Sequence, residues 1–268
     1  MTNPLRITSE QNSKIKLVKR LRSKRGRVQA QRFLIDYERD LQRALACGYT
    51  VDYVLYCPEI AAAPTWGEVE SYQVTPQLLN SISYRENPAG MVAILHSRPA
   101  KGLAHISSAA PNHIVVLVKL SVPGNVGALL RTADAAGIDA VILVDSALDL
   151  YNPNVIRSST GACFRENVYR LGGGEALAYL REKRFRIVAA AVDGATSLFE
   201  LEFRGETAII LGSEDLGLPH YWLKQADQLV RIPMAGGLTD SLNVSVSGAI
   251  LMYERFRQRC ACRHNIER

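Results

Sequence analysis

The hydrophobic pattern of the first hundred residues alternates between helical and strand periodicity. Between Ser13 and Leu21, apolar residues recur at near-helical spacing among lysines and arginines, which predicts a basic amphipathic helix. Short apolar runs bounded by glycine, proline or polar residues predict strands. The expected order is helix 13–21, a turn at 24–27, strand 33–35, helix 37–46, strands 51–56 and 72–74, helix 76–81 and strand 91–95. This pattern predicts a compact α/β domain of about ninety residues.

The second half alternates strands and helices more regularly. Strands are expected at 114–118, 140–144, 186–192, 207–211 and 228–232, and helices at 126–136, 153–160, 175–183 and 219–225, before a last helix. The strands are nearly continuous apolar runs, which are typical of a parallel sheet with helices on both faces. Residues 97–112 are rich in Ser, Ala, Pro and Gly and predict a linker. The predicted domains are therefore 1–96 and 113–268, joined by 97–112.

Three polar loops that contain glycine follow or adjoin predicted strands of this sheet. They read PGNVGALLR (123–131), LGSEDLGL (211–218) and IPMAGGLTDSLN (232–243). Ligands of such sheets bind beyond the carboxyl ends of the strands, and glycines let the backbone approach a ligand closely. Asp240 or Ser241 is expected to cap the last helix, which should reach Arg257 or beyond. The pattern predicts one shared site, although the last loop could also be an ordinary loop-to-helix junction.

Two common nucleotide motifs do not fit these loops. Gly212 and Gly217 have the first spacing of a phosphate-binding P-loop, but Leu218 and the following proline stand where that motif needs Lys and Ser/Thr. No GxGxxG opens the first strand–helix unit, which disfavours a dinucleotide fold. Glu214 is either a functional carboxylate or a helix-starting charge. Arg131, in an otherwise apolar helix, is either a snorkelling surface residue or an anion ligand.

Composition indicates a globular protein without a membrane segment. The 268 residues are 47% hydrophobic and 22% charged, and no apolar run approaches the length of a bilayer span. The five cysteines are scattered and form no CxxC pair, so neither a disulfide framework nor a zinc site is expected, and a reducing cytoplasm is favoured. The five histidines show no ligand spacing. We therefore expect no metal site.

Basic residues are concentrated near the start of the chain. The formal net charge is +6 and the pI is near 9.1, which alone is a modest indication of an anionic partner. The residues expected to contact it are Lys14, Lys16, Lys19, Arg20, Arg22, Lys24 and Arg25, with Arg27 and Arg32 nearby. Few acidic residues are interleaved with them, so a nucleic-acid surface is favoured over a merely solvated helical face.

The three loops, in this order, resemble the SpoU family of RNA ribose 2′-O-methyltransferases within the SPOUT superfamily. The resemblance covers residues 113–258 and lies in NVGALLRTADAAG, ILGSEDLGLP and IPMAGGLTDSLNVSVSGAILMYE. The segment YNPNVIRSSTGACF resembles the rRNA-directed members, and the first ninety-odd residues are similar to a ribosomal-protein-like domain that binds substrate RNA. Two stretches depart from the family pattern: Lys119–Val122, where many members are acidic and polar, and Asp36-Tyr37, where Glu-Gly is common.

The resemblance implies S-adenosylmethionine as cofactor, a homodimer, and a trefoil knot formed by the C-terminal segment. It implies an RNA-facing catalytic group of Asn125, Arg131, Glu214, Ser241 and Asn243. It also implies that the backbones of Gly212, Ile232 and Leu242 hold the adenosyl moiety. Because arginine keeps its proton up to a pH of roughly 12, we interpret Arg131 as a cation that orients a phosphate and stabilises the developing oxyanion.

The expected reaction is methylation of a ribose 2′-hydroxyl in RNA, with 23S rRNA as the expected target. The alternatives are a tRNA 2′-O-methyltransferase and a non-catalytic RNA- or ribosome-binding protein of the same fold. A nicotinamide-dependent oxidoreductase is disfavoured because the glycine fingerprint is missing.

Overall fold

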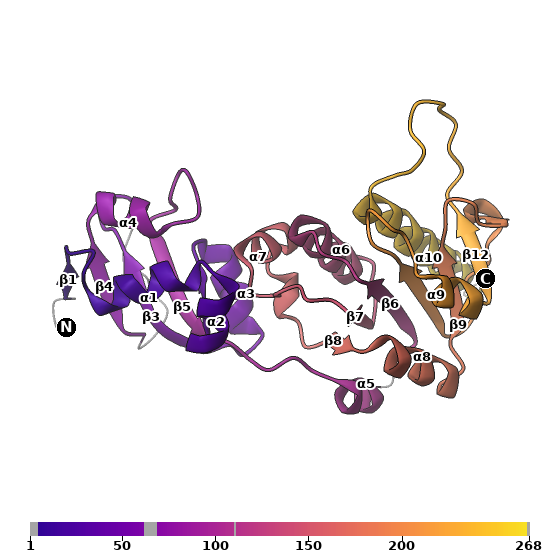
Figure 1. Cartoon of the computed structure of the whole chain (residues 1–268), viewed down its shortest axis with the longest axis horizontal. Helices are drawn as coiled ribbons and strands as arrows, with labels where there is room; N and C mark the ends of the chain where they lie inside the picture. Colours follow the sequence, from indigo (N-terminus) through magenta and orange to yellow (C-terminus); the bar gives the residue numbers. More distant parts are fainter. Residues whose placement is uncertain (1–4, 62–68, 110, 267–268) are drawn as a thin grey trace. The chain divides into compact units, whose positions relative to one another are not determined.

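The structure is a computed structural model that describes residues 5–61, 69–109 and 111–266. The chain forms two compact units (Figure 1). The first unit comprises the described residues up to Pro99 together with Asp149–Arg165, and the second comprises Ala100–Leu148 and the described residues from Glu166 onward. The main chain therefore passes between the two units three times.

The first unit contains a mixed five-stranded sheet. Its strand order is β1 (Arg6–Ile7), β4 (Ser71–Val74), β3 (Val51–Tyr56), β5 (Met91–His96) and β2 (Arg32–Ile35). Strand β5 is antiparallel to both of its neighbours, and the remaining pairs are parallel. Helices α1 (Ser13–Leu21) and α4 (Pro76–Ile82) cover one face, where Ile15, Val18 and Leu79 are fully buried. The predicted α/β character of this region is confirmed.

The other face of β2 carries helix α3 (Glu38–Ala46) and a segment from the second half of the sequence. This segment contains α7 (Pro153–Ser159) and the short 3-10 helix η1 (Ala162–Phe164). Because side chains alternate along a strand, Phe33 points away from the α1 face that Leu34 occupies. Tyr151 stacks on Phe33 with ring centroids 4.4 Å apart, and the Phe164 centroid lies 5.7 Å from Phe33. Aromatic packing thus makes the segment part of the first unit.

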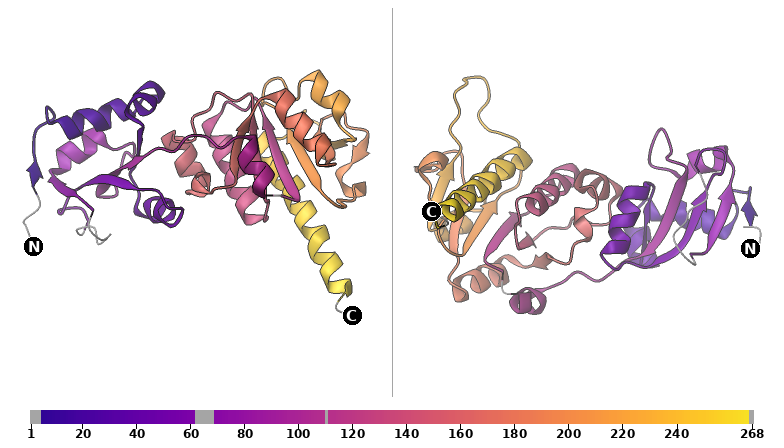
Figure 2. Two further views of the ribbon diagram at one scale, coloured as in Figure 1. Left: turned by 90° about the horizontal axis from the view of Figure 1, so that it is seen from below. Right: turned by 180° about the vertical axis from the view of Figure 1, so that it is seen from behind.

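The second unit is built on a seven-stranded sheet in which every pair is parallel. Its strand order is β10 (Thr196–Ser197), β12 (Gln228–Arg231), β9 (Arg186–Ala190), β11 (Thr207–Leu211), β6 (His113–Val118), β7 (Ala140–Val144) and β8 (Val168–Leu171). Helices α5 (Leu103–Ala109), α8 (Gly173–Glu182) and α9 (His220–Gln225) pack on one face, and α6 (Pro123–Ala135) and α10 (Val244–Ile266) on the other (Figure 2). The predicted parallel sheet with helices on both faces is confirmed.

Several short elements differ from the sequence-based expectation. Helix α2 (Lys24–Ala30) replaces the expected turn, because the Ser23 hydroxyl caps it and Gly26 leaves room for the carbonyl of Arg20. Helix α5 lies within the stretch expected to be a linker. Strands β1, β8 and β10 and the 3-10 helix η2 (Leu198–Glu200) are additional, and elements of two to four residues are too short to produce a clear periodicity.

The start of α10 also differs from the expectation. The helix begins at Val244, and the side chain of Asn243 accepts a hydrogen bond from the backbone N–H of Ser245 (2.9 Å), as an N-cap residue does. The expected caps, Asp240 and Ser241, are therefore wrong. Their place in the sequence is suitable for a cap, but the first helical turn forms two or three residues later. No helix in the described part of the chain is long and apolar enough to cross a membrane.

Candidate active site

A cavity of about 460 Å³ opens at the carboxyl ends of three neighbouring strands of the second unit. The strands are β11, β9 and β12, and the loops after β11 and β12 are two of the three loops singled out in the sequence. The lining residues are Ala190, Ala191, Val192, Leu211, Gly212, Ser213, Glu214, Asp215, Gly217, Val230, Ile232, Met234, Asp240, Ser241, Leu242, Asn243, Val244 and Ser247. The carboxyl ends of parallel strands meet at one edge of the sheet, and the cavity lies at that edge.

The loop after β11 folds tightly back on itself. Ser213 and Gly217 exchange backbone hydrogen bonds of 3.0 and 3.1 Å, and Gly217 has a φ of +63° that favours glycine. A side chain on Gly212 would collide with the backbone of Gly217 and Leu218. These glycines are therefore required by the close approach of two backbone segments, which turns Glu214 toward the cavity that it lines.

A directed chain of hydrogen bonds connects all three loops. Ser245 Oγ donates to Asn243 Oδ1 (2.6 Å), and Asn243 Nδ2 donates to Asn125 Oδ1 (3.2 Å). Asn125 Nδ2 in turn donates to Glu214 Oε1 (2.7 Å). Both amides are used as donor and acceptor at once, so the orientation of each is defined by its neighbours. The chain ends on the Glu214 carboxylate, which faces a cavity formed by residues far apart in the sequence.

The predicted site residues are distributed unevenly around this cavity. Six of them line it, namely Gly212, Glu214, Ile232, Ser241, Leu242 and Asn243. Asn125 reaches it through its hydrogen bond to Glu214. Arg131 is exposed on α6, about 9 Å along the helix axis from Asn125, and its side chain forms no hydrogen bond or ion pair with a described residue. The chemical roles of all these predicted site residues stay predictions.

Several contributions to the site were missed in the sequence, among them the carboxylates of Asp215 and Asp240. Ala190–Val192 complete the wall because β9 lies between β11 and β12, and the strand order cannot be inferred from local periodicity. Ser245 was visible as a polar residue at the start of the last helix, but only the structure shows that its hydroxyl extends the hydrogen-bond chain.

The chemistry of the cavity fits S-adenosylmethionine. Its volume lies within the usual range for small-molecule sites. Three carboxylates, those of Glu214, Asp215 and Asp240, line it and favour a ligand that carries positive charge, such as a sulfonium or an ammonium group. Within the described residues, no three His, Cys, Asp or Glu side chains come together as metal ligands would.

The basic residues near the start of the chain differ in their contacts and in their exposure. The Lys14 ammonium lies 4.3 Å from the ring centroids of both Tyr53 and Tyr72, and Lys19 bonds Glu10 at 2.6 Å. Arg22 donates to the carbonyls of residues 81 and 83. Lys16, Arg20, Lys24 and Arg25 are exposed. The RNA role of the whole group stays a prediction, and these exposed side chains are accessible to a partner.

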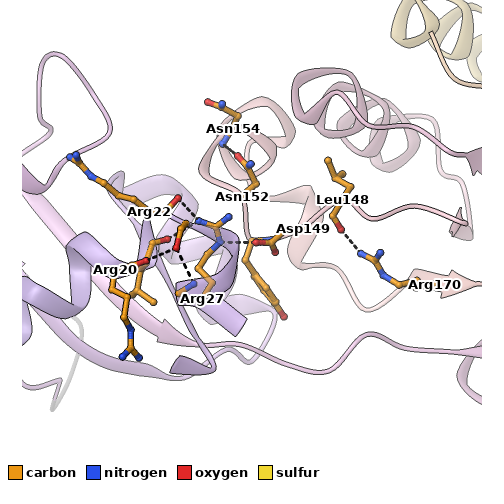
Figure 3. A network of polar contacts seen from close by, with 12 residues as sticks. Arg20, Arg22, Arg27, Leu148, Asp149, Asn152, Asn154 and Arg170 are labelled. Atoms are coloured by element: carbon orange, nitrogen blue, oxygen red, sulfur yellow. Dashed lines mark hydrogen bonds and ion pairs between the residues drawn. The ribbon is translucent and has the colours of Figure 1, made fainter. Parts of the chain in front are cut away.

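Arg27 is buried rather than exposed. Its Nε donates to Asp149 Oδ2 at 2.6 Å, and its Nη1 donates to the carbonyls of Leu21 and Arg22 (Figure 3). Its side chain is only 4% exposed and that of Asp149 12%. This arginine therefore holds the 149–165 segment within the first unit, and it is not available to a nucleic acid.

Comparison with known proteins identifies two family regions. Residues 112–253 match the SpoU rRNA Methylase family, and residues 12–93 match the MRM3-like substrate binding domain. The first match covers the sheet, the cavity and all three loops. The second covers most of the five-stranded sheet and the basic helices.

Full-length relatives give the same assignment. The chain is 29% identical to the 23S rRNA (guanosine(2553)-2′-O)-methyltransferase RlmP of Bacillus subtilis, over 92% of this chain and 97% of RlmP. A crystal structure of an RNA 2′-O ribose methyltransferase is 36% identical, with a TM-score of 0.82, and covers 96% of this chain and 100% of its own. The SpoU methyltransferase AviRb of Streptomyces viridochromogenes, solved with its cofactor AdoMet, is 28% identical, with a TM-score of 0.80 and coverage of 93% and 99%.

These matches confirm the expected enzyme class, an RNA 2′-O-ribose methyltransferase, and the expected cofactor, S-adenosylmethionine. The match extends over more than half of the chain, and it includes the residues that form the cavity. The chain belongs to the SpoU rRNA methylase family.

Proposed function

We propose that this enzyme methylates a ribose 2′-hydroxyl of 23S ribosomal RNA and that the cavity of the second unit is its active site. The observation that carries the proposal is the hydrogen-bond chain from Ser245 to Glu214, which joins the three family loops at one cavity. The ribosomal target is supported by relatives whose names state 23S rRNA as substrate, and by the exposed basic residues of α1 and α2.

Several residues around the cavity suit the cofactor. S-adenosylmethionine supplies a methyl group on a positively charged sulfur. The backbones of Gly212, Ile232 and Leu242 would hold its adenosyl part, because these residues line the cavity and glycine permits a close backbone approach. The nearby carboxylates of Asp215 and Asp240 favour the positively charged end of the cofactor.

The remaining residues would act on the ribose. Glu214 Oε1 already accepts a hydrogen bond from Asn125, and no described residue donates to Oε2. Oε2 is therefore suited to accept the hydrogen of the ribose hydroxyl as it attacks. Asn243 and Ser241 would position the nucleotide at the cavity. Arg131, exposed and without an ion-pair partner in the described residues, would hold a phosphate and stabilise the negative charge that develops on the oxygen.

Assembly and the knot belong to the same proposal. We infer a homodimer through α10, where Val246 and Tyr253 are 46% and 48% exposed although both are large apolar side chains. Leu251 of the same helix is fully buried within its own unit and does not contribute. The family resemblance further supports a trefoil knot in the C-terminal segment and a cytoplasmic location. Light scattering tests the dimer directly, and a monomer that still turns over would contradict it.

The reaction is tested by incubating total RNA with radiolabelled S-adenosylmethionine and mapping the labelled nucleotide. Label on a single 23S nucleotide is expected, and it should disappear in Glu214→Gln but persist in the matched surface variant Glu182→Gln. If tRNA becomes labelled instead, the substrate of the enzyme is tRNA and not 23S rRNA. If calorimetry shows that the cofactor binds but no RNA becomes labelled, the protein is a non-catalytic RNA-binding relative.

A further inference from the structure

The corner between β2 and α3 and the loop 83–85 form one tightly connected cluster in the first unit. Asp36 Oδ2 accepts hydrogen bonds from Ser83 Oγ (3.2 Å) and from the backbone N–H of Tyr84 (3.1 Å). Asp36 Oδ1 lies 3.6 Å from Arg85 Nε. One carboxylate thus joins two segments that are distant in sequence and brings the aromatic residues Tyr37 and Tyr84 to the same part of the surface.

Each of these tyrosines is paired with arginine. The guanidinium carbons of Arg85 and Arg39 lie 4.3 and 5.1 Å from the centroid of Tyr37. The guanidinium of Arg22 lies 5.5 Å from the centroid of Tyr84. Arg22 is itself fixed, because its Nη2 donates to the carbonyls of residues 81 and 83 at 3.0 and 2.9 Å. The rings and guanidinium planes are therefore held in place before any partner arrives.

Tyr84, Arg22 and Arg39 are accessible to solvent, whereas Tyr37 and Arg85 are half-buried. Tyr84 is 36% exposed, Arg22 is exposed and the Arg39 side chain is 45% exposed. A large aromatic ring that is both exposed and fixed loses little conformational entropy on binding, which is typical of a contact residue. Proteins recognise unpaired RNA bases by stacking them on aromatic rings and arginine planes.

The charge balance of this cluster differs from that of α1 and α2. Its three arginines, Arg22, Arg39 and Arg85, are accompanied by four acidic residues, namely Asp36, Glu38, Asp40 and Glu86, of which Asp36 pairs with Arg85 and Asp40 with Arg39. The nearby exposed Lys16, Arg20 and Arg25 have no acidic residues beside them in sequence. Attraction to phosphates is therefore weak at the cluster, and stacking is the interaction it can offer. Tyr37 also stands where the family resemblance commonly has glycine, so the family pattern does not require this ring.

We propose that Tyr37, Tyr84, Arg22, Arg39 and Arg85 form a stacking surface for unpaired nucleotides of the RNA substrate. The proposal rests on the proposed function only in that the partner is RNA. It deepens that function by assigning single-stranded or bulged nucleotides to the first unit, whereas the basic side chains of α1 and α2 contact phosphates. Affinity from stacking persists at high salt, and affinity from phosphate contacts does not.

The test is a salt titration of RNA binding by the full-length protein. A short single-stranded RNA that carries 2-aminopurine and the same strand in duplex form serve as probes, followed by fluorescence. Tyr84→Ala should weaken single-strand binding about five- to a hundredfold at every salt concentration, because one base no longer stacks. The slope of log affinity against log salt should not change, and Tyr84→Phe should restore both affinity and 2-aminopurine quenching.

The matched control is Phe199→Ala, which removes a ring in the second unit that is 76% exposed. It should leave RNA binding within twofold. Thermal melting confirms that Tyr84→Ala is folded, and Tyr84→Leu, which keeps apolar bulk without a π face, provides a second variant. Unchanged single-strand affinity in Tyr84→Ala, an equal loss in Phe199→Ala, or an effect confined to the salt slope would each overturn the stacking surface. Methyl transfer by the unmodified protein is measured separately, so failure of the stacking surface and failure of the proposed function are distinguishable.

Discussion

Two connections of the same parallel sheet have opposite environments. The Asp149–Arg165 segment leaves β7 and packs within the first unit, where Tyr151 stacks on Phe33 and Asp149 pairs with the buried Arg27. The Ile232–Asn243 segment leaves β12 and is mostly exposed, with Leu238 completely exposed to solvent. Both segments carry motifs typical of the family. One is a structural anchor and the other borders the cavity.

The difference shows that a recognisable motif does not by itself indicate a catalytic role. In the 149–165 segment, the polar groups are satisfied inside the unit: Tyr49 and Tyr151 lie with hydroxyls 3.2 Å apart, and Arg43 donates to the carbonyl of Thr160. In the other segment, Asp240 and Ser241 line a cavity that remains open for a ligand. Buried and satisfied polar groups therefore indicate stability, and convergent polar groups at a cavity indicate chemistry.

The largest effect is expected at the anchor. Arg27→Met leaves the Asp149 carboxylate mostly buried without its cation, which should cost about 3–5 kcal/mol of unfolding free energy. Urea denaturation measures the loss. The exposed neighbour variant Arg25→Met should change stability by no more than about 0.5 kcal/mol. The double variant Arg27→Met/Asp149→Leu should recover much of the loss, and an equal loss in Arg25→Met would refute the assignment.

At the cavity, the expected effect is on rate rather than stability. Arg131→Ala should reduce methyl transfer on the order of a hundredfold, because the transition state loses a stabilising positive charge. Its unfolding free energy should stay within about 0.5 kcal/mol of the unmodified protein, because the side chain is exposed. Initial rates with labelled cofactor measure the effect on methyl transfer, and urea denaturation measures the effect on stability. Loss of stability instead of rate would make Arg131 a structural residue.

A smaller effect distinguishes the exposed basic residues from the engaged ones. Neutralising Lys16, Arg20 and Arg25 to Gln should flatten the salt dependence of RNA binding, by roughly 0.7 to 0.9 in the log–log slope for each phosphate that the protein no longer neutralises. Lys14→Gln should change the slope less, because its ammonium lies between Tyr53 and Tyr72. Cofactor affinity should be unchanged in both variants. If all variants have the slope of the unmodified protein, these basic residues do not contact phosphates and form only a solvated helical face.

The smallest effect concerns the cysteine of the anchored segment. Burial raises the pKa of the Cys163 thiol to about 12, so the reactive thiolate is nearly absent at neutral pH. Iodoacetamide at mildly alkaline pH should therefore leave Cys163 unmodified in the folded protein while it labels the half-buried Cys47, as read by mass spectrometry. In urea, both cysteines should react at similar rates. Rapid labelling of folded Cys163 would show that the segment opens readily.

The sequence by itself determined the elements with strong periodicity, the parallel sheet and the family. Apolar runs such as 114–118 and 207–211 favour strands in a sheet that is covered on both faces. The glycine-containing loops were identifiable because the residue types needed for close backbone approach are few. These features depend on neighbours in the sequence, which is why periodicity and motif reading could find them.

Only the tertiary structure decided which residues meet. The β9 end joins the cavity because of a strand order that no local pattern encodes, and the 149–165 segment belongs to the first unit because its aromatic residues pack on β2. Arg25 and Arg27 are equivalent in a charge count. One is exposed, and the other is enclosed by Asp149 and two carbonyls. The role of a charged side chain depends on the counter-charges and carbonyls around it, and these come from distant parts of the chain.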